Sequence, residues 1–244
     1  MILTTIYEQL EGLGLKGFKN ALMQQSEDIN YTKLSFEERL HQLLESEINE
    51  KTNRRIKRLL TQAKLKDSSA SLEALEYNAT RGLDRSIILS LAGCIYISKK
   101  QNILITGATG VGKSFLAQAF ARKAIIEGFS ARYYRVTKLL EEIKLARLDG
   151  TYTKTLTKIS KFNLLVLDDF GISPLKADEL NDLFEVIEDR TLSGSTIVTA
   201  QLPISEWHNY LQNETIADAM MDRLIHSSHK IELKGDSMRK LHSI

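Results

Sequence analysis

Over the last two thirds of the chain, short apolar runs alternate with segments of helical periodicity. The apolar runs predict strands at 102–106, 131–136, 163–168, 196–200 and 230–233. Helical patterns lie between these strands at 113–127, 137–148, 174–192 and 204–226. A further helical stretch at 84–99 precedes the first strand. Strands that alternate with helices of this length are joined by crossovers, so the pattern predicts an α/β fold with a mainly parallel sheet and helices on both faces.

The first part of the chain, residues 1 to about 66, has helical spacing and none of the alternation typical of strands. One apolar stripe has members at i, i+3, i+4 and i+7: Ile56, Leu59, Leu60 and Ala63. Basic residues fall on another face of the same helix: Arg54, Lys57, Arg58 and Lys64. A polar segment then breaks the pattern. We therefore predict a small all-helical domain over 1–66, a linker over 67–80 and the α/β domain over 81–244.

The composition excludes several classes of protein. The 244 residues are 43% hydrophobic and 26% charged, which is typical of a globular protein, and the two prolines favour a helix-rich fold. The single cysteine, Cys94, excludes a disulfide framework and a cysteine-based zinc site, and we expect a buried thiol. His226 and His229 are suitably spaced on a helix but lack an obvious third metal ligand.

No segment has the features of a targeting or membrane sequence. Residues 1–14 contain Glu8 and Glu11 and no basic stretch, so they do not form a signal peptide. The longest nearly apolar stretch, 87–97, is well short of the roughly 20 residues that cross a bilayer. We therefore expect a cytoplasmic protein with no membrane partner.

Charge is distributed unevenly along the helical part. The formal net charge of +2 does not by itself indicate a nucleic-acid partner. The segment 37–50 is mainly acidic, whereas the segment 51–66 carries basic residues without an acid between them: Lys51, Arg54, Arg55, Lys57, Arg58, Lys64 and Lys66. This reversal makes the second segment a candidate surface for a polyanion.

A glycine-rich loop follows the first predicted strand and matches the complete phosphate-binding motif G-x-x-x-x-G-K-S. It consists of Gly107, Ala108, Thr109, Gly110, Val111, Gly112, Lys113 and Ser114, and Phe115 follows in the helix. Glycines let backbone N–H groups approach phosphates closely, and the positive end of the following helix favours the same anions. Lys113 supplies a charge to the β- and γ-phosphates and Ser114 a hydroxyl to Mg²⁺. The motif therefore predicts ATP and Mg²⁺ as cofactors.

Two aspartates end the third predicted strand. The apolar run at 164–167 suits a strand buried on both faces. At its carboxyl end, Asp168 is expected to reach the Mg²⁺ shell, and Asp169 to polarise a water for attack on the γ-phosphate. The alternative is a structural role for the pair as a helix cap.

Polar residues after the later strands are further candidates. Gln201, or with less support Thr199, is expected to orient the attacking water. Arg223 is a candidate for neutralising transition-state charge on the nucleotide of a neighbouring subunit, and Arg239 for the same role within its own subunit. Each arginine is equally compatible with a plain surface position.

Several of these stretches together resemble the IstB family, the helper ATPases encoded beside the transposase in a class of bacterial insertion sequences. Besides the loop, the resemblance rests on Leu-Leu-Val-Leu-Asp-Asp-Phe-Gly at 164–171, Thr-Ala-Gln-Leu-Pro at 199–203, Asp-Arg-Leu-Ile-His at 222–226 and Lys-Gly-Asp-Ser-Met-Arg-Lys at 234–240. It extends to the basic helix at 53–60 and to 71–76, and so covers nearly the whole chain. The nucleotide motifs occur in many protein families, whereas the carboxy-terminal motifs at 222–226 and 234–240 and the basic helix are much more specific for this family.

That family is similar to helicase loaders of the DnaC type and belongs with the AAA+ ATPases. The resemblance implies a five-stranded parallel sheet in the order 5-1-4-3-2, preceded by a small helical domain. It also implies ATP-dependent self-association on double-stranded DNA with little sequence preference, and a transposase as partner. Arg223, Gln201 and Arg239 then carry over to the box VII, sensor I and sensor II positions.

Two departures from the AAA+ pattern concern the catalytic residues. Most members have a glutamate where this chain has Asp169, whose side chain is one methylene shorter. The sequence ends at Ile244, so we expect no full carboxy-terminal helical lid, which is the usual carrier of sensor II.

Two sets of basic residues are candidate DNA contacts. In the first hypothesis, the basic helix contacts DNA phosphates and does not recognise the base sequence. The contacts would come from Arg54, Arg55, Lys57, Arg58 and Lys64. The second places DNA near Lys154 and Lys158, in the polar segment before the strand of Asp168. The alternative for each set is a solvated helix face.

The favoured interpretation is an ATP-dependent DNA-binding ATPase that assembles on target DNA and regulates or activates its partner transposase. A replicative helicase loader like DnaC has the same ATPase site but a ring helicase as partner. A small-molecule P-loop kinase is the third alternative, against which the positions of Asp168, Gln201 and Arg223 argue.

Overall fold

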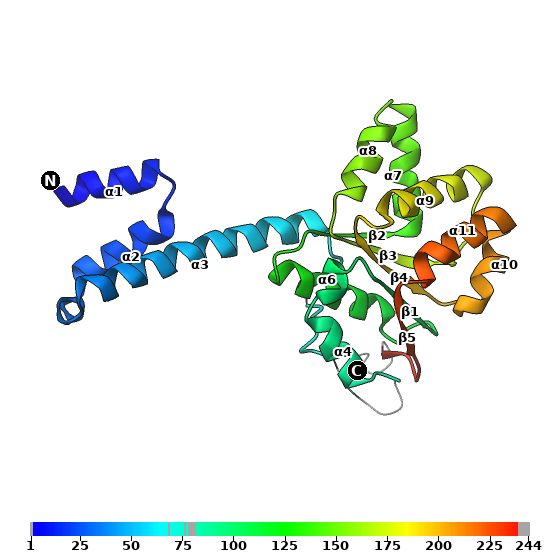
Figure 1. Cartoon of the computed structure of the whole chain (residues 1–244), viewed down its shortest axis with the longest axis horizontal. Helices are drawn as coiled ribbons and strands as arrows, with labels where there is room; N and C mark the ends of the chain where they lie inside the picture. Colours follow the sequence, from blue (N-terminus) through cyan, green and yellow to red (C-terminus); the bar gives the residue numbers. More distant parts are fainter. Residues whose placement is uncertain (1, 68, 76, 78–81, 239–244) are drawn as a thin grey trace. The chain divides into compact units, whose positions relative to one another are not determined.

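The computed structural model describes residues 2–67, 69–75, 77 and 82–238, and the chain divides into two compact units, residues 1–58 and 59–244 (Figure 1). The first unit contains the elements α1 (Ile2–Gly12), α2 (Lys16–Glu27), the short 3₁₀ helix η1 (Ile29–Lys33) and most of α3 (Phe36–Ala63). The division falls within α3, before the predicted boundary at residue 66. The predicted linker lies partly outside the described residues, and the domain boundaries stay a prediction.

Local contacts fix the start of α3 and its packing against α2. The Ser35 hydroxyl accepts the N–H of Glu38 at 3.2 Å, and the Glu38 carboxylate accepts the N–H of Ser35 at 2.8 Å. This reciprocal capping box satisfies N–H groups that have no partner within the helix. In α2, a Cβ on Gly17 would lie 2.5 Å from the carbonyl oxygen of Ser46, so the two helices approach too closely there for any side chain.

Within the described residues, five parallel strands form one sheet in the order β2-β3-β4-β1-β5. They are β1 (Asn102–Gly107), β2 (Ala131–Arg135), β3 (Leu164–Phe170), β4 (Ser195–Ala200) and β5 (Ser228–Leu233). Read from the opposite edge, the order is 5-1-4-3-2. The predicted AAA+ sheet is therefore confirmed, and the carboxyl ends of all its strands lie along one edge.

Helices cover both faces of this sheet (Figure 1). On one face lies α6 (Lys113–Ile126), with α4 (Arg85–Ala92) against it. On the other lie α7 (Val136–Leu148), α8 (Tyr152–Ser160), α9 (Ala177–Arg190) and α11 (Glu214–Ile225). In β3, Leu165 and Leu167 belong to the core on this second face, so the alternation of a strand directs Val166 and Asp168 to the face covered by α6.

Three predicted segments differ from the structure. The polar segment that contains Lys154 and Lys158, for which no element is predicted, forms α8, which buries Leu156 and Ile159. The predicted helix 84–99 is divided at Cys94 (φ 57°) into α4 and α5 (Ile95–Ser98). The predicted helix 204–226 is divided into η3 (Ile204–Glu206), α10 (Trp207–Leu211) and α11. Gly93 ends α4 and Cys94 precedes α5, whereas α10 ends at Gln212 with φ 52°, where no glycine signals the break.

Several compositional features can be located. Cys94 is free and buried, and burial raises the pKa of its thiol to about 11. His226 is exposed, and the His229 ring lies 3.2 Å from the side-chain oxygen of Gln101. Among the described residues, no three His, Cys, Asp or Glu side chains are grouped so that they could hold a metal ion. The described helices include none that is long and apolar enough to span a bilayer.

Candidate active site

The loop after β1 needs its glycines for two physical reasons. Gly107, Gly110 and Gly112 have φ angles of 146°, 85° and 99°, which residues with a Cβ rarely adopt. Space is also limited, because a Cβ on Gly107 would lie 2.2 Å from the carbonyl oxygen of Leu233, and one on Gly110 would lie 2.2 Å from Ser237 Oγ. The segment after β5 therefore closes tightly over the loop.

Lys113, the first residue of α6, turns back toward the loop. Its Nζ donates hydrogen bonds to the carbonyl oxygens of Gly107 at 2.8 Å and Ala108 at 2.7 Å. Burial lowers the pKa of the ammonium, while the charges of Asp169 and Asp168 act in the opposite direction. The cation is thus held at the loop, as the motif predicts for a phosphate ligand.

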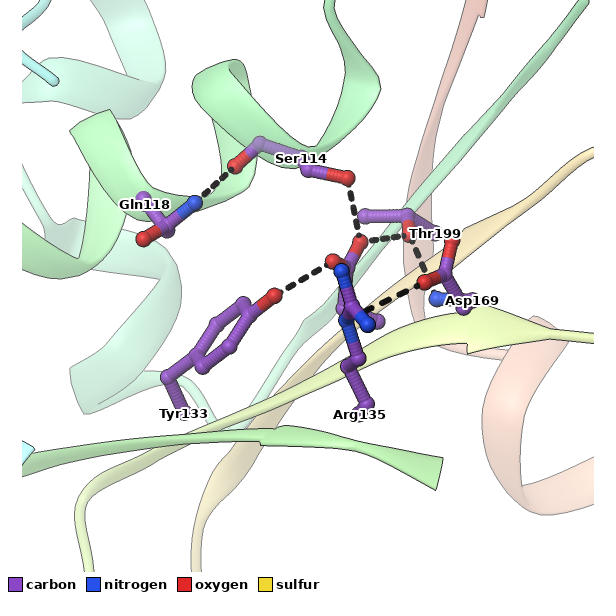
Figure 2. A network of polar contacts seen from close by, with 7 residues as sticks. Ser114, Gln118, Tyr133, Arg135, Asp169 and Thr199 are labelled. Carbon is purple, nitrogen blue, oxygen red and sulfur yellow. Dashed lines mark hydrogen bonds and ion pairs between the residues drawn. The ribbon is translucent and has the colours of Figure 1, made fainter. Parts of the chain in front are cut away.

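Asp168 is the centre of a buried network in which Ser114, Tyr133 and Thr199 converge (Figure 2). Asp168 is only 1% exposed. The Ser114 hydroxyl donates to Oδ1 at 2.8 Å, Thr199 donates to the same oxygen, and the Tyr133 hydroxyl donates to Oδ2 at 2.5 Å. One carboxylate therefore connects α6 with β2, β3 and β4.

Asp169 has an unusual backbone conformation, with φ 63°. Its N–H donates to Thr199 Oγ1 at 3.1 Å, and its Oδ2 lies 3.5 Å from Arg135 Nε (Figure 2). Burial and the charge of Asp168 raise the pKa of Asp169, while Arg135 and Lys113 oppose the rise. A carboxylate with a raised pKa beside a phosphate-binding loop has the properties of a general base.

The two candidates for orienting a water have different surroundings. Gln201 is exposed beyond the end of β4, and its Oε1 accepts a hydrogen bond from Thr109 Oγ1 at 2.9 Å. Thr199 is fully buried, and its hydroxyl is engaged by Asp168 and Asp169. Thr199 therefore fixes the two aspartates, and Gln201 is the candidate that solvent can reach.

A cavity of about 750 Å³ lies beside the loop and the two aspartates. Its walls include the loop, both aspartates and Gln201, as the sequence predicts, and the volume is within the range of small-molecule sites. The sequence analysis did not assign the other wall residues to the site: Lys66, Asp67, Gln118, Tyr133, Arg135 and Met238.

The segment after α3 reaches this cavity through Gln118. The backbone N–H groups of Lys66 and Asp67 donate to Gln118 Oε1 at 2.7 and 2.8 Å, and Gln118 Nε2 donates to the carbonyl oxygen of Ser114 at 3.1 Å. The Lys66 charge also acts to lower the pKa of Asp169. No motif marks these residues, because only the folded chain brings them to the loop.

Arg223 does not line this cavity. Its Nη1 donates to the carbonyl oxygen of Ala219 at 2.8 Å, its Nε pairs with Glu188, and its guanidinium lies 5.4 Å from the Phe184 ring centre. The carbonyl oxygen of Arg223 accepts from Asn102 Nδ2 at 3.0 Å, at the start of β1, whereas the loop follows the end of that strand. Arg239, the candidate in cis, lies outside the described residues.

The candidate DNA contacts are exposed but lie on two separate elements. On α3, Arg54 is 3.5 Å from both Glu47 and Glu50, so these carboxylates partly neutralise its positive charge. Arg55, Lys57 and Arg58 are exposed on the same helix, whereas Lys64, predicted on that helix, is exposed in a turn just after its end, with φ 51°. Lys154 and Lys158 are exposed on α8 and lie four residues apart, which places them on one face of that helix. The DNA assignments stay predictions.

The residues present fit a magnesium nucleotide. Loop N–H groups, the start of α6 and Lys113 suit phosphate oxygens. Ser114 Oγ and Asp168 Oδ1, 2.8 Å apart, are the kind of oxygen donors that Mg²⁺ binds directly or through water. Mg²⁺, when bound, supplies positive charge to the phosphate oxygens.

The family described as IstB-like ATP binding protein matches residues 8–244. The chain belongs to this family. The match spans the helical unit as well as the sheet, and it confirms the family inferred from the motifs.

The relatives of this IstB family member come from bacterial insertion sequences. An insertion sequence ATP-binding protein of Sinorhizobium fredii is 39% identical over 233 residues, which are 96% of this chain and 95% of the relative. One of Pseudomonas fluorescens is 43% identical over 197 residues, or 81% of this chain and 85% of the relative.

Solved structures with the same fold include DnaI and a helicase loader. The crystal structure of DnaI has a TM-score of 0.59 at 23% identity, over 68% of this chain and 92% of that one. The DnaC helicase loader also has a TM-score of 0.59, at 19% identity, over 68% of this chain and 98% of that one. These likenesses show that the IstB family member shares the fold of AAA+ proteins.

Proposed function

We propose that this chain is a magnesium-dependent ATPase that binds duplex DNA, assembles on it and activates a partner transposase during insertion-sequence transposition in the cytoplasm. The observation that carries the proposal is the contact between Ser114 and Asp168 at the end of a complete phosphate-binding loop, in a chain of the IstB family.

For hydrolysis, each residue has a role that its surroundings support. The loop and Lys113 bind the phosphates, and Ser114 and Asp168 hold the metal. Asp169 accepts a proton from the attacking water, which Gln201 orients at the rim of the cavity. Arg223 acts on the nucleotide of a neighbouring copy, and Arg239 is the candidate sensor within the same copy.

Binding of DNA and transposase is supported by context and charge. The relatives are named as insertion sequence ATP-binding proteins, and the family resemblance implies a transposase as the partner. The exposed basic residues of α3 and α8 suit DNA phosphates. Because such contacts ignore base identity, the DNA binding would be largely independent of sequence.

The test is the rate of ATP hydrolysis with no DNA, with random duplex and with single strands, at one fixed salt concentration because phosphate contacts depend on salt. We expect stimulation mainly by duplex. Lys113→Ala should weaken ATP binding roughly 10–100-fold, because it removes charge-assisted contacts. Asp169→Asn should still bind ATP but hydrolyse it about 100-fold more slowly.

The fold shared with DnaI and the DnaC helicase loader favours a second candidate function, loading of a helicase. Stimulation mainly by single strands would support that function over transposition. Indifference to both forms of DNA, together with phosphate transfer to a small acceptor, would favour a P-loop kinase instead.

The DNA surface is tested by comparing the two helices. We suggest Arg58→Glu with Arg54→Gln on α3, and Lys154→Gln with Lys158→Gln on α8. Each lost phosphate contact should weaken duplex binding for all sequences and reduce the salt slope by about one. Full affinity and an unchanged salt slope in one of these pairs would exclude that helix as the surface.

A further inference from the structure

Tyr133 is a buried polar residue in the candidate site to which the ATPase roles assign nothing. It lies in β2, opposite Val166 of β3, and its hydroxyl donates to Asp168 Oδ2 at 2.5 Å. Because residues two apart in a strand share a face, Tyr133 lies on the same face as Asp168. The pairing of β2 with β3 therefore places the Tyr133 hydroxyl beside the Asp168 carboxylate.

Asp168 has donors on both oxygens. Ser114 and Thr199 donate to Oδ1, and Tyr133 donates to Oδ2 (Figure 2). If Ser114 offers its oxygen lone pair to a metal, its hydrogen bond to Asp168 has to be given up or redirected. The contacts from Thr199 and Tyr133 do not depend on that change. They hold one oxygen each, which fixes the plane of the carboxylate.

The properties of Tyr133 suit this task. Its ring is held in a buried strand, and tyrosine has only two side-chain torsions, so little freedom is lost in placing the hydroxyl.

We propose that Tyr133 is a positioning residue that holds the Asp168 carboxylate in the orientation required by the magnesium nucleotide. This inference rests on the proposed ATPase function. In this role Tyr133 acts through its hydrogen bond to Asp168.

The neighbouring tyrosine provides a matched control. Tyr134 lies in the same strand but belongs to the core on the opposite face, and its hydroxyl donates to Glu142 at 3.0 Å. Tyr133→Phe and Tyr134→Phe each delete one partly or fully buried hydroxyl from β2, but only the first removes a contact to Asp168.

The measurement is the affinity of the full chain for a fluorescent, non-hydrolysable ATP analogue, once with Mg²⁺ and once with a chelator. For Tyr133→Phe we expect unchanged affinity in chelator and about a tenfold smaller gain from Mg²⁺, since loss of a residue that orients a metal ligand costs about 10–100-fold. Tyr134→Phe should keep the full gain.

A double-mutant cycle separates positioning from general damage to the fold. In an Asp168→Ala background, Tyr133→Phe should cause no further loss of the Mg²⁺ gain, because the residue acts through the missing carboxylate. A second loss in that background would overturn the inference, as would equal losses in affinity with and without Mg²⁺.

The remaining outcomes distinguish the two proposals. A wild-type chain that gains no affinity from Mg²⁺ would overturn the ATPase function and the role of Tyr133 together. A normal gain in the wild type and an equal gain in Tyr133→Phe would overturn only the role of Tyr133.

Discussion

Asp169 shows how immediate neighbours can set the chemistry of a single residue. Burial and the adjacent Asp168 charge make its ionised form less favourable, whereas Arg135, 3.5 Å away, stabilises it. A general base has to be ionised to accept a proton. Hydrolysis should therefore decline on acidification at a higher pH than an ordinary aspartate would cause.

Replacing Arg135 by Gln should shift this acidic decline further upward. Loss of the positive charge removes a stabilising contact of the ionised carboxylate and raises the pKa of Asp169 further, and the effect should be modest because the pair is partly exposed. The measurement is the pH dependence of kcat between pH 4 and 8. The matched control, Lys138→Gln, removes an exposed cation that pairs with Glu141 at 2.7 Å and should leave the profile unchanged. A wild-type profile in Arg135→Gln would contradict the assignment of Asp169 as base.

At the residue scale, the residues that the motif assigns to the nucleotide site lie together in the structure. Lys113, Ser114 and Asp168 meet because loop, helix and strand follow one another in a known arrangement. Tyr133 and Arg135 belong to no motif, and they reach the aspartates through the pairing of β2 with β3. That pairing joins residues more than 30 positions apart, which local periodicity does not encode.

At the element scale, the end of β3 departs from simple alternation. A regular strand would direct Asp169 to the face opposite Asp168. Instead, the pairing with β4 shifts register between Leu167 and Phe170, and Asp169 adopts φ 63°. Such an irregularity redirects a side chain. It brings the Asp169 carboxylate to Arg135, while Phe170 continues into the core.

Arg190 connects several elements at the end of α9. It is 2% exposed, and burial lowers its pKa to about 10. Its guanidinium donates to the carbonyl oxygens of Ile159 at 3.0 Å, Phe162 at 2.9 Å and Ser195 at 2.6 Å. These acceptors belong to the end of α8, the turn before β3 and the start of β4.

Arg190→Leu should destabilise the sheet unit by about 3 kcal/mol, because buried carbonyl oxygens lose their donors. For a domain of this size the melting temperature should fall by roughly 6–12 °C, measured by calorimetry. Arg190→Lys keeps a charge but loses the planar set of donors, so we expect an intermediate value. A melting temperature for Arg190→Leu equal to the wild-type value would exclude this role.

Prediction of elements was limited by one mostly polar helix and by one helix break without a glycine. The strands and their order followed from apolar runs and the family resemblance. The helix α8 was missed, since only Leu156 and Ile159 are buried within it and its other residues are mostly polar. The break at Gln212 (φ 52°) lies in a segment without glycine, so the pattern at 204–226 resembled one long helix.

At the scale of the whole molecule, the position of Arg223 is informative. It lies near the start of β1, whereas the loop follows the end of that strand, about 20 Å away for six residues of strand. An arginine side chain cannot span that length. If Arg223 takes part in hydrolysis, it therefore acts on the nucleotide of another copy of the chain, and the site is complete only in an assembly.

A mixing experiment tests this requirement. Arg223→Ala and Lys113→Ala should each reduce hydrolysis at least about 100-fold when assayed alone. In a mixture, an Arg223→Ala subunit supplies an intact loop and a Lys113→Ala subunit supplies an intact arginine. With equal amounts and random assembly, about one quarter of the interfaces should be complete, and that share of the wild-type activity should return.

The ion pair with Glu188 provides the structural comparison for this experiment. Glu188→Gln removes the partner of Arg223 and leaves the guanidinium in place. If Arg223 only stabilises its own subunit, Glu188→Gln should also lose activity. Mixing Arg223→Ala with Lys113→Ala should then restore nothing, because the intact loops would belong to the destabilised Arg223→Ala subunits. Recovery on mixing, together with activity in Glu188→Gln, would instead require Arg223 to reach across an interface. The assembly would then be the catalytic unit.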